Sequence, residues 1–212
     1  MHHLGKEDYM SQIQPTVPGQ DIPYLKIPHT EPGIHSAIIH RLLLHFAKVS
    51  PGQELVIVCI GTDRSTGDCL GPLVGTALSK LNHRGHFHLY GTLEEPVHAM
   101  NLKETLNKIN QSFINPFIVG IDACLGQTTS VGSIQVVQGP LRPGAGVNKE
   151  LPPVGDIHVT GIVNVGGFME YFVLQNTRLS LVMRLSEIIS SSVYTAIKEW
   201  NRGFIPLVRR EQ

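Results

Sequence analysis

The stretch from residue 55 to residue 75, LVIVCIGTDRSTGDCLGPLVG, constrains the fold more than any other part of the sequence. Its first six residues are apolar and rich in Val and Ile, which is typical of a strand buried on both faces. Gly61 ends this run, a polar loop follows, and Asp68 comes just before a segment expected to begin a helix. Because open α/β sheets form their binding crevices at the carboxyl ends of strands, this carboxylate indicates a functional site.

A second strand follows the same plan. Residues 116–121 (PFIVGI) form a short apolar run that leads into Asp122. A less apolar strand is expected at residues 86–90. If the 55–60 strand lies between the other two, its connections leave in opposite directions, and Asp68 and Asp122 flank one crevice at the switch point of the sheet.

Strands that alternate with helices predict an α/β fold with a mostly parallel sheet covered on both faces. A helix is expected from Thr30, which would cap it, and another over residues 72–81 with Leu73, Ala77 and Leu81 on its inner face. Asn101 and Glu104 form a capping-box pattern that predicts a third helix. Further strands are expected at residues 132–137 and 156–163, and a closing helix at residues 179–200.

Composition limits the functional classes. The length of 212 residues and 42% hydrophobic content predict one domain, at residues 21–212, after a disordered segment at residues 1–20. Basic and acidic residues number 17 each, so no excess of positive charge favours nucleic acid. No apolar run is long enough to predict a membrane span or a signal segment, and the three cysteines suggest no disulfide framework. We therefore expect a cytoplasmic protein with no membrane partner.

Two carboxylates in one crevice can act as an acid and a base. When they lie close together, one keeps a proton while the other stays ionised and can activate water for hydrolysis. The alternative is structural: Asp68 would cap the helix near Leu70, and Asp122 would cap a helix after its own strand, since Asp is favoured at such positions.

Several motifs resemble those of a known family. Residues 60–63 (IGTD) and 66–72 (TGDCLGP) resemble the strand-loop motif of the spore germination protease, in which an Asp precedes Ala-Leu-Gly-Pro. Residues 121–123 (IDA), followed by Thr128 and Thr129, match that protease's second Asp motif, and residues 143–149 (PGAGVNK) resemble its Gly-rich loop. The resemblance covers residues 55–167 and extends to the YyaC-type sporulation proteins, which are similar to the same protease.

This resemblance implies a three-layer α/β/α, phosphorylase/hydrolase-like fold that is shared with hydrogenase-maturation endopeptidases. It also implies an aspartic-type endopeptidase that needs no cofactor, with Asp68 and Asp122 as its catalytic pair. The expected substrates are proteins or peptides such as small acid-soluble spore proteins, in the forespore or mother cell of a spore-forming bacterium. It suggests self-association into a homo-oligomer. The chain departs from the protease by carrying Cys69 and Cys124 in place of small apolar residues and by being shorter.

The expected substrate-binding residues lie in the loops around the crevice: Thr66, Gly71, Glu95, His98, Gly144 and Lys149. The chain could instead be a metal-dependent maturation endopeptidase, with His98 or His158 joining the aspartates as ligands, although a structural role for His158 is favoured. A nucleophilic thiol at Cys69 or Cys124 is disfavoured, because the neighbouring acids oppose thiolate formation. A third possibility is a non-catalytic binding or regulatory protein on the same fold.

Overall fold

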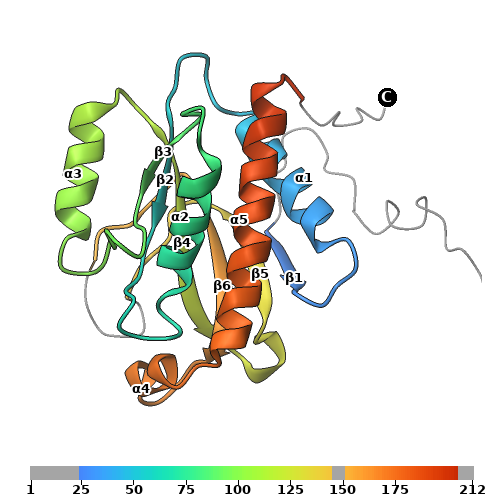
Figure 1. Ribbon diagram of the computed structural model, residues 1–212, viewed down its shortest axis with the longest axis vertical. Helices are drawn as coiled ribbons and strands as arrows, with labels where there is room; N and C mark the ends of the chain where they lie inside the picture. The colour runs from blue at the N-terminus through green and yellow to red at the C-terminus, as the bar shows by residue number, and fades with distance from the viewer. Residues whose placement is uncertain (1–23, 145–150, 205–212) are drawn as a thin grey trace, which may run out of the picture.

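The computed structural model describes residues 24–144 and 151–204, so the disorder expected for residues 1–20 lies outside the described residues. The described chain forms one six-stranded sheet in the order β1-β5-β6-β4-β2-β3 (Figure 1). Its strands are β1 (Leu25–Pro28), β2 (Leu55–Cys59), β3 (His88–Tyr90), β4 (Phe117–Gly126), β5 (Ser133–Gln138) and β6 (Ile157–Val165). The pairs β3-β2, β2-β4 and β4-β6 are parallel, whereas β5 and β1 add antiparallel pairs at one side. The sheet is therefore mostly parallel, as predicted.

Helices cover both faces of this sheet. One hydrophobic core joins the sheet to α1 (Ile34–Phe46), α2 (Leu70–Leu81) and α5 (Leu179–Asn201). A second core on the opposite face packs α3 (Leu102–Ser112) against β2. Every residue of β2 is buried, because its odd and even positions enter different cores. The buried strand predicted at residues 55–60 is confirmed, and so is its place between the other two parallel strands.

The short helix α4 (Glu170–Gln175) lies beyond the end of the sheet, at the bottom of Figure 1. It follows β6 and precedes the long helix α5. A short 3₁₀ turn at Thr128–Ser130 connects β4 to β5. In the described ranges, no helix is long and apolar enough to cross a lipid bilayer.

Helix α2 buries a different face from the one predicted. Two apolar stripes share this segment, and the structure buries the one formed by Leu70, Val74 and Leu78, while Leu81 is 37% exposed. Gly71 explains why this stripe is the buried one. The helix backbone at Gly71 lies so close to β2 that a Cβ there would be 2.0 Å from the carbonyl oxygen of Ile60. Only the observed rotation lets the helix backbone approach the end of β2 so closely.

Two predicted helix caps are wrong. Helix α1 begins at Ile34 after Gly33, which adopts the left-handed conformation (φ 82°), so Thr30 does not cap it. At α3 the Asn101 side chain accepts a hydrogen bond from the His98 N–H and donates one to the Pro96 carbonyl. Glu104 pairs instead with Lys108 (2.8 Å). The reciprocal bonds of a capping box therefore do not form, although α3 does begin directly after Asn101.

Candidate active site

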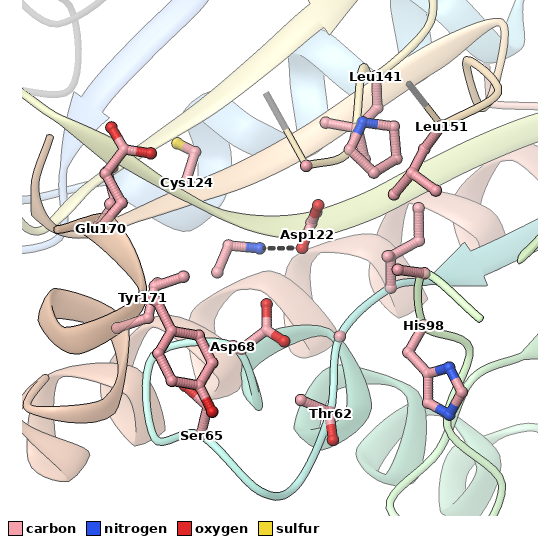
Figure 2. Close-up of a pocket in the computed structure, with 18 of the residues that line it drawn as sticks. Thr62, Ser65, Asp68, His98, Asp122, Cys124, Leu141, Leu151, Glu170 and Tyr171 are labelled. Carbon is pink, nitrogen blue, oxygen red and sulfur yellow. Dashed lines mark hydrogen bonds between the residues drawn. The ribbon is translucent and has the colours of Figure 1, made fainter. Parts of the chain in front are cut away.

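A cavity of about 650 Å³ lies at the carboxyl ends of β2 and β4. Asp68 and Asp122 both line it, and Figure 2 shows their carboxyl groups directed into the same space. The cavity has apolar walls and a few convergent polar groups, which is the usual character of a small-molecule or peptide site. The structure thus brings together the two carboxylates that were expected to share one crevice.

The loop after β2 places Asp68 in this cavity. Gly61 has a positive φ (143°), and a Cβ there would lie 1.9 Å from the carbonyl oxygen of Asp68. The Thr62 N–H donates to that same carbonyl (3.2 Å), so the loop folds back on itself before α2 begins. The residue at the N-cap position of α2 is Cys69, and no side chain caps the helix. Asp68 is therefore free of the capping role that the structural alternative gives it.

Asp122 does not cap a helix either. Strand β4 was expected to end at this residue, but it continues to Gly126, so Asp122 lies within the strand. The side chain is only 7% exposed, and its Oδ1 accepts the N–H of Ala123 (2.7 Å). The interpretation of both aspartates as helix caps is wrong.

The surroundings raise the pKa of both carboxyl groups. Burial is the main cause at Asp68, and it is partly offset by the charge of His98 and a hydrogen bond from the Thr62 N–H. Burial also raises the pKa of Asp122 well above its usual range, and the negative charge of Asp68 raises it further. Burial therefore favours the protonated form of both groups, and the charge of Asp68 adds to this effect at Asp122. Because Oδ1 of Asp122 accepts the Ala123 N–H, Oδ2 is the oxygen better placed to carry a proton.

The expected binding residues divide into two groups. His98 and Gly144 line the cavity, and Figure 2 shows His98 on the side opposite Tyr171. Glu95 is exposed and Thr66 is half-buried, and neither lines the cavity. Gly71 is packed against Ile60, where its lack of a side chain permits the close contact of helix and strand. Lys149 lies outside the described residues.

The described residues do not assemble a metal centre. No three His, Cys, Asp or Glu side chains in residues 24–144 and 151–204 are grouped so that they could hold a metal ion. His158 hydrogen-bonds through Nδ1 to the Gly139 carbonyl (2.8 Å), which is the structural role favoured for it. It does not line the cavity.

The thiols are poorly suited to nucleophilic attack. Cys69 is buried, and its Sγ donates to the Thr66 carbonyl. Cys124 lines the cavity, but burial raises the pKa of its thiol to about 11. At neutral pH this group is almost entirely protonated, so it lacks the thiolate that nucleophilic catalysis requires.

Further lining residues are not singled out by the sequence. Ser65 is 8% exposed, and its hydroxyl has no hydrogen-bond partner among the described residues. Tyr171 and Leu174 reach the cavity from α4, which is held to the loop by a bond from the Gly67 N–H to the Leu174 carbonyl (2.8 Å). The polar loop could have drawn attention to Ser65, but no local pattern connects α4 to residues more than a hundred positions earlier.

Known proteins are similar to this chain in sequence or in fold. The crystal structure of a [NiFe] hydrogenase maturation protease, HycI from Thermococcus kodakarensis KOD1, superimposes with a TM-score of 0.51 at 18% identity, covering 73% of this chain and 98% of that one. The likeness shows a common α/β fold. The chain is 53% identical over 165 residues to the uncharacterized protein YyaC of Bacillus subtilis (strain 168), covering 77% of this chain and 80% of that protein. The family described as "Protein of unknown function (DUF1256)" matches residues 26–192, and the chain therefore belongs to the DUF1256 family.

Proposed function

We propose that this protein is a peptidase that hydrolyses peptide bonds with Asp68 and Asp122. One observation carries the proposal: two carboxyl groups line one cavity, neither caps a helix, and the pKa of each is raised. Buried carboxyl pairs that share a proton are a recurrent device for acid-base hydrolysis. The fold shared with a maturation protease is compatible with this chemistry and does not by itself establish it.

The two aspartates have different tasks in the proposed mechanism. Ionised Asp68 takes a proton from a water molecule as the water oxygen attacks the peptide carbonyl carbon. Protonated Asp122 then donates its Oδ2 proton to the amide nitrogen as the carbon–nitrogen bond breaks. The cycle leaves the proton on Asp68, and its return to Asp122 restores the starting state. This assignment of roles is supported by the environment of Asp122, where burial and the charge of Asp68 both raise the pKa.

The resemblance of three sequence motifs to those of the spore germination protease supports the substrate class. All three occur in the same order as in that protease, and Asp68 and Asp122 fall on its two Asp motifs. We therefore propose a sporulation-associated role, with small acid-soluble spore proteins as the first substrates to test.

The test is cleavage of purified small acid-soluble spore proteins by the parent chain and by Asp68→Asn and Asp122→Asn. Asp63→Asn is the matched control, because Asp63 belongs to the same loop but is exposed and does not line the cavity. Cleavage by the parent and by Asp63→Asn, with none by the two folded site variants, is the expected result. Circular dichroism establishes folding. Equal cleavage by all four proteins would refute the assignment of the aspartates, and cleavage by none would refute the substrate class.

A metal-dependent maturation endopeptidase is the second candidate, because the fold is shared with a [NiFe] hydrogenase maturation protease. The two candidates differ in metal content. A peptidase that relies on the carboxyl pair keeps its activity after dialysis against a chelator, whereas a metal-dependent endopeptidase loses activity and regains it when nickel or zinc is returned.

A further inference from the structure

Strand β4 is longer than its neighbour β2. Their pairing ends at Cys59 and Ile121, and the last bond between the two segments runs from the Ile60 N–H to the Ile121 carbonyl (2.7 Å). On its other side β4 remains paired with β6 as far as Gly126. Among the residues that the structure describes, the final residues of β4 therefore have a neighbouring strand on one side only. An open strip of sheet edge lies where β2 has turned away.

Alternation along the strand identifies the backbone groups on this open edge. Ile121 directs its carbonyl toward β2, so Ala123 and Leu125 direct their N–H and carbonyl groups to the same side. The pairing of β4 with β6 shifts register between Cys124 and Leu125. Beyond this shift the Gly126 carbonyl accepts a bond from the Gly166 N–H on the β6 side, so the alternation along β4 continues through it. The Ala123 N–H is held by Asp122. Within the described ranges, no hydrogen bond reaches the Ala123 carbonyl or either backbone group of Leu125 on the open side.

The cavity occupies this open side. Residues 122–125 all line it, and Figure 2 shows Asp122 and Cys124 along β4 with Asp68, Ser65 and Thr62 across the open space. The Ser65 hydroxyl is buried there without a partner in the described parts of the chain. Buried polar groups are normally hydrogen-bonded, so a hydroxyl and three backbone groups without partners around one cavity point to a ligand that supplies donors and acceptors.

We propose that the substrate binds as an extended polypeptide segment that adds a strand to β4 in the place vacated by β2, pairing with Ala123 and Leu125. This inference concerns how the substrate segment is bound. It rests on the proposed peptidase function only for the cleavage of that segment after binding. Strand addition to an open sheet edge supplies main-chain hydrogen bonds that are independent of sequence. It also lays the peptide backbone alongside Asp122, where a carbonyl carbon can come within reach of both carboxyl groups.

The walls of the cavity specify the side chains of this segment. Alternate residues of an added strand point to opposite faces of the sheet. On one face they would meet Leu141 and Leu151, which belong to the core around α3. On the other they would meet Tyr171 and Leu174 of α4, the latter packed against the opposite core. The substrate segment is therefore apolar at neighbouring positions, as in an unfolded tail or an unfolded stretch of a protein.

The test uses a synthetic probe, Lys-Thr-Val-Leu-Leu-Val-Thr-Lys, blocked at both ends and labelled with fluorescein. Two further probes carry N-methyl groups on alternate residues, one in each register. Binding is measured by fluorescence anisotropy to the full chain with Asp68→Asn, which is used so that no turnover intervenes. Amide hydrogen exchange of Leu125 is followed in the same complex by NMR.

The unmodified probe is expected to bind, and methylation in one register should weaken binding roughly tenfold or more, because strand hydrogen bonds are lost. Methylation in the other register should change binding less than about threefold, and the Leu125 amide should exchange more slowly in the complex. Failure of the unmodified probe to bind, equal effects of the two methylated probes, or unchanged exchange at Leu125 would each overturn the proposal.

The same experiment separates this inference from the peptidase proposal. In one outcome the probe binds and responds more strongly to N-methylation in one register than in the other, while the parent chain cleaves neither the probe nor the spore proteins. In that case strand addition stands and the peptidase function fails. If the parent cleaves the spore proteins while the probe shows no such pattern, the catalytic proposal stands and strand addition is wrong.

Discussion

Asp122→Asn should make the protein more stable at neutral pH even as it removes activity. The pKa of Asp122 is raised in the folded state, mainly by burial, above the value near 3.9 that an unfolded chain provides. Folding is therefore favoured most below that unfolded value, and stability is lost as the pH rises toward the folded-state pKa. Asn resembles the protonated carboxyl in shape and never ionises, and its oxygen can still accept the Ala123 N–H. The substitution should remove this loss of stability.

The size of the effect follows from proton linkage. Within the window between the unfolded-state and folded-state pKa values, each pH unit costs the parent about 1.4 kcal/mol relative to the variant. For a chain of 212 residues, this corresponds to a divergence in melting temperature of about 3 to 6 °C per pH unit. The divergence begins above about pH 4 and ends when Asp122 ionises in the folded protein.

Melting temperatures of the parent and the variant, measured by circular dichroism from pH 4 to pH 8, provide the assay. Asp68→Asn is the informative comparison: since burial is the larger cause at Asp122, most of the pH dependence due to Asp122 should persist when the Asp68 charge is removed. Asp63 is exposed, so the melting temperature of Asp63→Asn should change with pH as that of the parent does. Parallel melting curves for the parent and Asp122→Asn across the whole range would refute the reasoning, because they would show that Asp122 is not held protonated by the fold.

Three further predictions concern the packing around the site and the core. Gly71→Ala should lower the free energy of unfolding by about 1 to 3 kcal/mol in urea titration, because its Cβ would overlap the Ile60 carbonyl; Gly166→Ala, whose Cβ meets only ordinary contacts, should change it by less than about 1 kcal/mol. Burial and nearby positive charges lower the pKa of His45 to about 4, so the contribution of this group to stability falls by at most about 3 kcal/mol as the pH falls from 6.5 to 4, opposite in sign to the contribution of Asp122. His45→Leu should remove the His45 contribution, so its difference in stability from the parent should change with pH over this range, and a constant difference would count against the reasoning. Ser65→Ala should leave stability unchanged or raise it by about 1 kcal/mol while weakening binding of the peptide probe, and a loss of stability with unaltered binding would contradict the role given to its unpartnered hydroxyl.

Much of the fold follows from local patterns. The apolar run of β2 predicts a strand buried on both faces, and the four-residue spacing of Ile38, Leu42 and Phe46 predicts the inner face of α1, which the structure buries. In both elements the apolar residues that form the sequence pattern are the residues that the fold buries, so the prediction succeeds. Where the pattern is ambiguous, prediction fails: α2 carries two equivalent apolar stripes, and contact between Gly71 and the end of β2 selects one of them.

Strand β1 shows the other limit of local patterns. Its four residues, Leu25–Pro28, have too few alternations to be recognised, and they become a strand only because β5 offers an edge to pair with. The extension of β4 past Asp122 has a similar cause. Residues 123–126 (ACLG) have no marked strand pattern, but pairing with β6 keeps them extended.

The sequence by itself determined that Asp68 and Asp122 follow buried apolar runs, and therefore that both belong near the carboxyl ends of parallel strands. It did so because hydrophobic periodicity is a property of neighbouring residues. Only the tertiary structure decided that Asp122 lies inside a strand, that burial raises the pKa of its carboxyl group, and that the described edge of β4 beside it is open. These features depend on which segments end early and which continue, and on how much water is excluded where distant segments meet, and neither is encoded within any single stretch of the chain.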